Sequence, residues 1–411
     1  MSPLRRIARA SLALLSGDAI ARLLMFGTTV YAARVLGPVS FGLVTFAQAL
    51  LGYFVLASDW GLSIYGAREI ARDPPRGREA WRAISGMRLL IATSLLLAAL
   101  LVLFTTRMDR LTQLVVALTL ASAVPLAAMP DWAARGAGRM KLAGVLSALQ
   151  PGLALLLVLA LVRGPHSVAW VPLARLIGAA LAAALGWALL GLPAPSLRPT
   201  ATPWLKEHGV ARLLTSGGIL MLASTAVLVY NSADQLILKA VQGNQAVGIY
   251  GSAYRIIQLP MAASYTVMAS AIPFLVGAAR TDPAAADRTV RRLTWIAAVA
   301  GLAIAVVVWA LREPIVRLVY GNAYLDSARA LGVLAFAVPL DFVISVKGTA
   351  YVAAGRERGT LVCVLLAAIT NVVANLIWIP RFGMMAAAWT TLASYGVLLV
   401  AYALIMDTRR S

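Results

Sequence analysis

The chain has 411 residues, of which 61% are hydrophobic and 13% are charged, and its mean hydropathy is +0.83. A soluble domain carries about 25% charged residues, so this composition excludes an ordinary soluble protein. The formal net charge of +20 would indicate nucleic-acid binding in a soluble protein, but no loop combines a long basic run with aromatic residues. In a multi-pass membrane protein the same excess follows from the enrichment of Lys and Arg in cytoplasmic loops, so we expect no nucleic-acid partner.

The charged residues form short clusters between apolar stretches, each close to the roughly 20 residues that cross a bilayer as a helix. The alternating ten-residue pattern of an outer-membrane barrel is absent from the sequence. The first apolar stretch contains Asp18 and Arg22, which argues against a cleavable signal. We predict an all-α polytopic protein with twelve transmembrane helices, at 11–35, 41–60, 84–104, 111–131, 142–162, 168–191, 209–232, 244–277, 293–311, 327–352, 360–379 and 384–406.

A glycine-rich turn occurs twice in the sequence. Gly37, Gly42 and Ala47 align with Gly243, Gly248 and Ala253, each at a separation of 206 residues, which is half the chain. The sequence Ala-Val-Pro-Leu also occurs twice, and each copy is followed by Gly-Arg, at Gly138-Arg139 and at Gly355-Arg356. These repeats predict two pseudo-symmetric six-helix bundles in parallel orientation, a central cavity and alternating access.

A segment rich in proline and polar residues separates the two predicted bundles. We therefore predict an N-terminal bundle over 1–191, a cytoplasmic linker over 192–208 and a C-terminal bundle over 209–411. If the N-terminus is cytoplasmic, the cytoplasmic side collects 22 Lys and Arg residues and the opposite side collects 8. The ratio predicts that both termini are cytoplasmic.

The sequence offers no pattern typical of catalysis or of a metal centre. Cys363 is the one cysteine, and the two histidines, His166 and His208, fall in different loops. No metal-ligand spacing or nucleophile–base motif occurs. We therefore expect no enzymatic activity, no metal and no cofactor.

Ionisable residues inside membrane helices are costly, so those that occur usually face an interior cavity. Buried positive residues outnumber deep acids, and guanidinium groups bind phosphate in bidentate fashion. A cationic cavity for an anionic headgroup is therefore predicted, with the candidate residues Arg22, Arg175, Arg255, Lys347 and Arg88. The alternative is an internal pair, since Asp18 precedes Arg22 by four residues on one helix face. Asp18 and Asp341 are candidates for binding a coupling ion, or are hydrogen-bonded structural acids.

Short motifs along almost the whole chain carry a family resemblance. In the first half they are Ala33–Pro38 with Phe41-Gly42, and Asp131-Trp132 through Gly138–Lys141. In the second half they are Asn231, Asp234–Leu238, Val247–Tyr250, Ala253–Ile256, Val319–Gly321 with Tyr324, Asn371, Asn375, Ile379-Pro380, Phe382-Gly383 and Ala386–Ala388.

With these motifs the chain resembles the polysaccharide transporter (O-antigen flippase) family of the multidrug/oligosaccharidyl-lipid/polysaccharide superfamily. The resemblance implies a V-shaped fold like that of the MATE transporters. It implies a protein of the inner or plasma membrane that moves a polyprenyl-pyrophosphate-linked oligosaccharide, with its anionic headgroup, to the outer leaflet. It also implies coupling to an ion, either proton or sodium, and a monomer working beside a polymerase and other polysaccharide-assembly proteins, for example in lipopolysaccharide synthesis.

Three alternatives differ from this interpretation in features of the sequence. A multidrug antiporter of the same superfamily would carry acidic cavity residues for cationic drugs, whereas the predicted cavity is basic. A peptidoglycan-precursor flippase usually has fourteen spans. A membrane polysaccharide polymerase or ligase would have a long outer loop with catalytic residues, but here the longest loops are predicted to be cytoplasmic.

Overall fold

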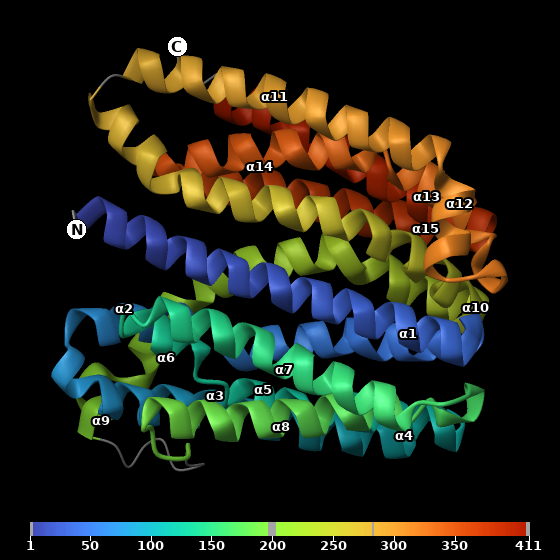
Figure 1. The fold of residues 1–411 in the computed structure, drawn as a ribbon, viewed down its shortest axis with the longest axis horizontal. Helices are drawn as coiled ribbons and strands as arrows, with labels where there is room; N and C mark the ends of the chain where they lie inside the picture. The colour runs from blue at the N-terminus through green and yellow to red at the C-terminus, as the bar shows by residue number, and fades with distance from the viewer. Residues whose placement is uncertain (1–2, 196–202, 282, 408–411) are drawn as a thin grey trace. The chain divides into compact units, whose positions relative to one another are not determined.

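A computed structural model of the chain describes residues 3–195, 203–281 and 283–407. Over these residues the chain is helical and contains no strand (Figure 1). The first helices are α1 (Pro3–Asp59), α2 (Leu62–Arg72), η1 (Pro74–Arg76), α3 (Gly77–Thr105), α4 (Arg110–Ala121), α5 (Ala123–Ala127), α6 (Asp131–Gly136), α7 (Met140–Leu161), η2 (Pro165–Ser167), α8 (Trp170–Leu190) and α9 (Pro203–His208). They are followed by α10 (Val210–Thr281), α11 (Pro283–Ala310), α12 (Arg312–Val319), η4 (Asn322–Tyr324), α13 (Ser327–Leu334), α14 (Ala337–Ala353), α15 (Glu357–Ala401) and a π-helical turn η5 (Tyr402–Asp407).

Three of the helices, α1, α10 and α15, are hairpins of two membrane-length segments. Each contains a single glycine with non-helical backbone angles, at Gly37, Gly243 and Gly383. These six segments and the single segments α3, α4–α5, α7, α8, α11 and α13–α14 make twelve in the described residues. Eight runs of the described helices, two of them hairpins, are long and apolar enough to cross a membrane. The twelve-helix prediction is confirmed, and the protein is a multi-pass membrane protein.

The turn that repeats in the sequence has the same backbone geometry in both copies. Gly37 has φ 73° and ψ 171°, and Gly243 has φ 77° and ψ −168°. L-residues with a side chain rarely adopt such positive φ values, whereas glycine adopts them without a steric penalty. The α1 ribbon turns back on itself (Figure 1), and Gly37 is the residue within α1 that has non-helical backbone angles. The predicted helical hairpins are therefore confirmed.

The second repeat also has matching structure. The two Ala-Val-Pro-Leu copies begin α5 and α14, each directly after a short break in a membrane-length segment. The glycines of the two Gly-Arg pairs both have φ 71°. After each, the arginine N–H donates to the carbonyl five residues earlier, Arg139 to Ala134 and Arg356 to Tyr351, both at 2.9 Å. This is the Schellman arrangement that ends a helix, and it ends α6 in the first half and α14 in the second.

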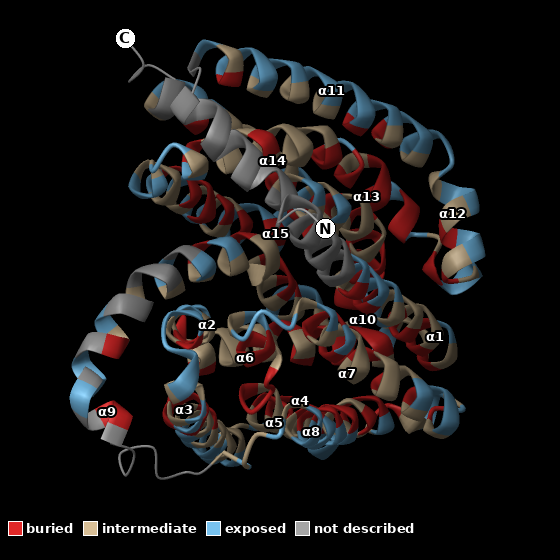
Figure 2. Cartoon of the chain, turned by 60° about the vertical axis from the view of Figure 1, so that its left-hand side comes forward, coloured by how far each residue is buried: buried red, intermediate tan, exposed pale blue. Residues whose placement is uncertain are grey.

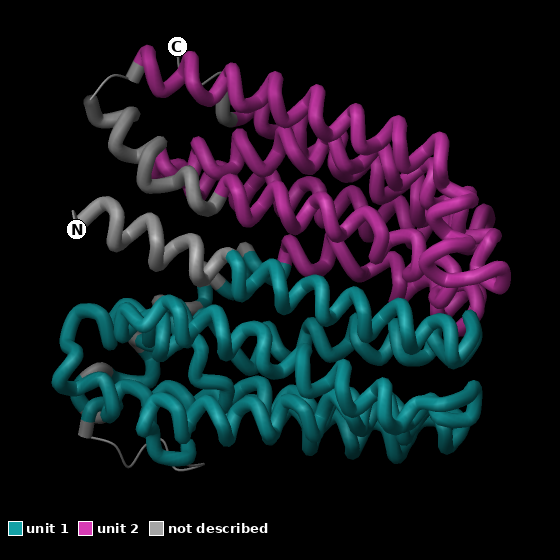
Figure 3. Tube along the Cα trace, viewed as in Figure 1, with its two compact units in different colours: residues 1–225 teal, residues 226–411 magenta. Residues whose placement is uncertain are grey.

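The chain forms two compact units, residues 1–225 and 226–411 (Figure 3). The predicted domain limits at 191 and 209 stay a prediction, and residues 196–202 of the predicted linker, together with Arg409 and Arg410, lie outside the described residues. The parts of the linker on either side of that gap are packed on unit 1. Trp81 Nε1 donates to Pro193 O at 3.0 Å, and Trp204 is buried in the same apolar cluster as Trp81. The first turns of α10 follow α9 onto this unit, where Trp60 Nε1 donates to Leu214 O at 3.0 Å.

Small residues allow close helix packing within each unit. In unit 1, α1 packs on α7, and a Cβ added at Gly17 would lie 2.4 Å from Gly144 Cα. In unit 2, α11 packs on α14, and a Cβ at Gly301 would lie 2.6 Å from Pro339 Cα. Interfaces of this kind are typical of membrane helices, where association depends on close van der Waals contact.

Candidate functional site

A buried polar cluster in unit 2 centres on Asp234 of α10, which is 1% exposed. Its carboxylate accepts a hydrogen bond from the Tyr250 hydroxyl at Oδ2 and one from the Gln235 N–H at Oδ1, at 2.7 Å. Thr391 Oγ1 of α15 also donates to Oδ2, at 3.4 Å, and lies 3.1 Å from the Tyr250 hydroxyl. Two segments 157 residues apart in sequence therefore meet at this carboxylate.

The cluster continues from Asp234 through a row of tyrosines. Tyr250 stacks on Tyr254, with ring centroids 6.0 Å apart, and the Tyr254 hydroxyl donates to Asn231 Oδ1 at 3.0 Å. Tyr395 of α15 donates to the same oxygen at 3.5 Å and contacts the ring of Tyr230 edge-on, at 5.0 Å.

Asp341 of α14 lies beside this row. It interacts electrostatically with Tyr230, Tyr254 and Tyr395. Its Oδ2 is shielded from solvent and has no hydrogen-bond partner among the described residues. A carboxylate oxygen that is shielded from solvent and lacks a partner is costly, so this oxygen is suited to a proton or a cation.

A second row of polar side chains lies inside the α15 hairpin. Asn375 Nδ2 donates to Asn371 Oδ1 at 2.9 Å, and Asn371 Nδ2 donates to Ser394 Oγ at 3.1 Å. Thr390 Oγ1 donates to Asn375 Oδ1. All four side chains are fully buried, and Thr390 directly precedes Thr391 of the Asp234 cluster. The interior of unit 2 thus contains two sets of buried oxygen atoms, from hydroxyl, amide and carboxylate groups.

The chemistry of this set favours a monovalent cation or a proton. The described residues contain no group of three or more His, Cys, Asp or Glu side chains that would hold a metal ion. Carboxylate, carbonyl and hydroxyl oxygens are the ligands that hard cations prefer. A single carboxylate among neutral oxygens offsets one positive charge.

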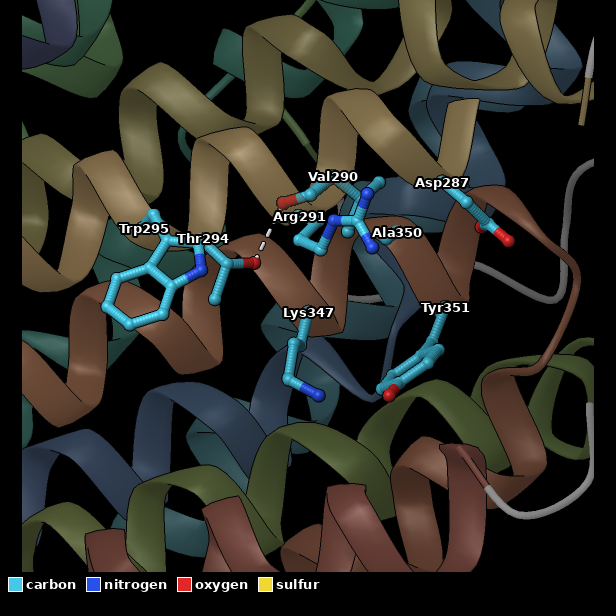
Figure 4. A pocket seen from close by; sticks show the side chains of 8 residues that line it. All are labelled: Asp287, Val290, Arg291, Thr294, Trp295, Lys347, Ala350 and Tyr351. Atoms are coloured by element: carbon cyan, nitrogen blue, oxygen red, sulfur yellow. Dashed lines mark hydrogen bonds between the residues drawn. The ribbon is translucent and has the colours of Figure 1, made fainter. Parts of the chain in front are cut away.

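The predicted basic residues of unit 2 lie in two different surroundings. Arg255 of α10 is partly buried and interacts electrostatically with Tyr320 and Tyr254. The Tyr320 hydroxyl is buried without a hydrogen-bond partner among the described residues. Lys347 lines a pocket between α11 and α14 (Figure 4).

The predicted basic residues of unit 1 also differ from one another. Arg88 is buried and its Nε lies 3.0 Å from Asp59 Oδ1, so it has an internal counter-ion. Asp59 Oδ2 accepts a hydrogen bond from Ser63 Oγ at 2.9 Å. Arg175 of α8 is partly buried and Arg22 of α1 is exposed within the unit.

The alternative pairing of Asp18 with Arg22 is not observed: the ion pairs among the described residues do not include it. The candidate basic residues are divided between the two units. Arg22, Arg88 and Arg175 belong to unit 1, and Arg255 and Lys347 belong to unit 2. Their assignment to a common cavity stays a prediction, as do the ion-coupling roles of Asp18 and Asp341.

Sequence reasoning misses the Asp234 cluster, because Asp234 lies just beyond the predicted span 209–232 and appears only among the motifs of the family resemblance. A usable signal was present in the sequence. Asn371 and Asn375 are four residues apart within an apolar stretch, as are Thr390 and Ser394. This spacing puts each pair on one helix face, and polar residues in a membrane helix usually face the protein interior.

Comparisons with known proteins agree with this architecture. The sequence profile described as polysaccharide biosynthesis protein matches residues 7–279, and the profile described as MatE matches residues 220–377. Comparison with curated protein sequences finds no match.

The fold is shared with solved structures of known proteins. The lipid II flippase MurJ, in an inward closed conformation, is similar with a TM-score of 0.72 and 13% identity, over 97% of this chain and 88% of that one. An inward-facing multidrug resistance MATE transporter has a TM-score of 0.71 and 17% identity, over 98% and 99% of the two chains. A transporter of the multidrug/oligosaccharidyl-lipid/polysaccharide superfamily from Pyrococcus furiosus has a TM-score of 0.65 and 17% identity, over 100% of this chain and 96% of that one. The predicted fold class and resemblance are confirmed, and the profile match over most of the sequence shows that the chain belongs to the polysaccharide biosynthesis protein family, with the fold of that transporter superfamily.

Proposed function

We propose that this protein moves a polyprenyl-diphosphate-linked oligosaccharide from the cytoplasmic to the outer leaflet of the cell membrane, as a step in making a surface polysaccharide such as O-antigen. The observation that carries the proposal is the family match over residues 7–279. The fold supports movement of a lipid-linked substrate, since it is shared with a protein described as a lipid II flippase. The motion would be an alternating access of the substrate to the two sides of the membrane.

Arg22, Arg175 and Arg255 would bind the diphosphate. Each lies in a membrane-length helix, Arg22 in α1, Arg175 in α8 and Arg255 in α10. An arginine inside a span is costly unless it meets an anion or water, and a diphosphate offers oxygens in the geometry that guanidinium binds. Arg88 is the weakest member of the predicted set because Asp59 already neutralises it.

The movement would be driven by a coupling ion, proton or sodium, in the interior of unit 2. Asp234, with Tyr250 and Thr391 beside it, supplies one negative charge and neutral oxygens. Asp341, which also interacts electrostatically with Tyr254, is the second candidate acid. The ratio of basic residues on the two sides supports cytoplasmic termini, and we propose that the protein works as a monomer beside the enzymes of polysaccharide assembly.

The second candidate function is an ion-coupled multidrug antiporter. The MatE profile match over residues 220–377 and the buried acids of unit 2 favour it, because carboxylates in a cavity attract cationic drugs. The arginines favour the anionic substrate instead.

Gene deletion separates these two functions. Accumulation of lipid-linked oligosaccharide with loss of surface polysaccharide supports the flippase, whereas drug sensitivity without such accumulation supports the antiporter. In complemented cells we expect Arg22→Ala and Arg255→Ala to abolish surface polysaccharide while the protein remains in the membrane at wild-type amount. Normal polysaccharide in both variants would contradict the diphosphate-binding role of these arginines.

A further inference from the structure

Unit 2 contains a pocket of about 260 Å³ between the first turns of α11 and the second half of α14. Its α11 side chains recur at three- and four-residue intervals, and so do those of α14, so each helix presents one face to it. Pockets for drug-sized ligands measure about 300–1,000 Å³. This pocket therefore has room for a small headgroup and is too small for an oligosaccharide.

The polar groups of the pocket favour a phosphate. Arg291 enters from α11, and Lys347 and Tyr351 enter from α14 (Figure 4). Thr294 also lines the pocket, but its hydroxyl donates to Val290 O at 2.8 Å. Two cationic side chains and one carboxylate, that of Asp287, line the pocket, so its lining carries a net positive charge. A guanidinium, an ammonium and a phenol together provide charge-assisted hydrogen bonds for phosphate oxygens.

The surroundings of the pocket place it next to lipid. Only 11% of the most apolar stretch of α11 is buried, and exposed residues run along this helix (Figure 2). Trp295 is 70% exposed and Val299 is 63% exposed, and in a membrane an apolar helix face of this kind contacts acyl chains. Trp295 also lines the pocket, so it lies where the polar pocket meets the apolar face. Indole rings are enriched at the headgroup level of bilayers.

We propose that this pocket binds the phosphate headgroup of an anionic phospholipid, with Arg291 and Lys347 holding the phosphate and Trp295 beside the first carbons of the acyl chains. Basic pockets between helices on the cytoplasmic side of membrane proteins bind such headgroups. Only the choice of the cytoplasmic leaflet depends on the proposed orientation of the chain. Bound lipid would bridge α11 and α14 and reduce the repulsion between the two cations. Lys347 then belongs to a lipid site and not to the substrate cavity.

The test measures lipid binding to the purified full-length protein by native mass spectrometry. Phosphatidylglycerol and phosphatidylcholine with identical acyl chains are titrated separately into the wild type and into Arg291→Gln and Lys347→Gln. The matched control is Arg292→Gln, because Arg292 is the neighbour of Arg291 on α11 and does not line the pocket. Thermal unfolding of each variant checks that it is folded.

We expect the wild type to bind phosphatidylglycerol more tightly than phosphatidylcholine, each pocket variant to bind it about tenfold more weakly, and Arg292→Gln to match the wild type. Equal binding of the two lipids by the wild type would overturn the proposal, even if no pocket variant folds. Equal weakening in Arg292→Gln would also overturn it. A third titration uses polyprenyl diphosphate: if the pocket variants lose only that lipid, the pocket serves the substrate and the proposal is wrong. Since the readout is mass and not flipping, failure here leaves the proposed function untouched.

Discussion

Replacing Asp234 with asparagine removes the negative charge from the buried cluster of unit 2 and keeps the shape of the side chain. The carboxylate accepts hydrogen bonds from Tyr250, Thr391 and the Gln235 N–H. The amide keeps one oxygen for Gln235, and the two hydroxyls can rotate to accept from its NH₂ group. Hydrogen bonds to a charged group contribute about 1.5–3 kcal/mol each, against about 0.5–1.5 kcal/mol for neutral pairs. Because the variant also avoids burying a charge, we expect it to fold with a loss of at most about 2 kcal/mol.

The effect on a bound cation is expected to be larger than the effect on folding. Two unit charges about 4 Å apart attract by about 4 kcal/mol at an effective dielectric constant of about 20. The amide oxygen recovers part of this attraction. A net loss of about 3 kcal/mol corresponds to an affinity roughly 100-fold lower, since each 1.4 kcal/mol is about tenfold. Asp234→Asn should therefore separate folding, which survives, from cation binding, which is lost.

The assay is the thermal unfolding midpoint of the purified protein titrated with sodium, lithium, potassium or acid, because a ligand that binds only the folded state raises this midpoint. Asp326→Asn is the control, since Asp326 is an exposed acid of the same unit. We expect the control to keep the ion-dependent shift and Asp234→Asn to lose it. A wild-type shift in Asp234→Asn would refute the assignment of the coupling ion to Asp234. A shift lost only in Asp341→Asn would move the ion to that acid.

Two further predictions concern stability. Asp59→Ala leaves Arg88 buried without its counter-ion, and we expect it to lower the free energy of unfolding by about 3 kcal/mol. Combining it with Arg88→Met should recover most of this loss. If the double variant recovers nothing, the unpaired Arg88 is not the cause of the loss. Gly243→Ala forces a positive φ on a residue with a side chain, although a Cβ there meets nothing within 4 Å. We expect a loss of about 1–2 kcal/mol, whereas Gly396→Ala, within α15 and equally open, should be neutral or stabilising; equal unfolding midpoints for these two variants would contradict the turn assignment.

Features that depend on one residue type or on local spacing could be predicted from the sequence. The membrane-length helices follow from apolar length, and the turns at Gly37 and Gly243 follow from the backbone freedom of glycine. Both were confirmed because no distant partner is needed to specify them. The helix-ending turns at Gly138 and Gly355 depend on the same freedom of glycine.

Features that depend on which helices pack together could not be predicted in this way. Thr391 reaches Asp234 across 157 residues, and nothing in the local sequence of α10 indicates that partner. The same holds for Arg88, whose counter-ion Asp59 lies on another helix, so residue type and depth alone placed Arg88 in a cavity. Counting buried charges predicts a cationic cavity, and the pairing of helices decides which charges remain available for it.

Flipping by the purified protein tests the central claim most directly. The full-length chain is reconstituted into vesicles with a polyprenyl-diphosphate-linked oligosaccharide, and the fraction of glycan accessible to an added glycosidase is followed over time under an imposed sodium or proton gradient. We predict that the protein makes glycan on the opposite leaflet accessible, that the gradient accelerates this, and that Arg22→Ala and Arg255→Ala abolish it. Accessibility equal to that of protein-free vesicles, in the presence of folded wild-type protein and either gradient, would contradict the claim.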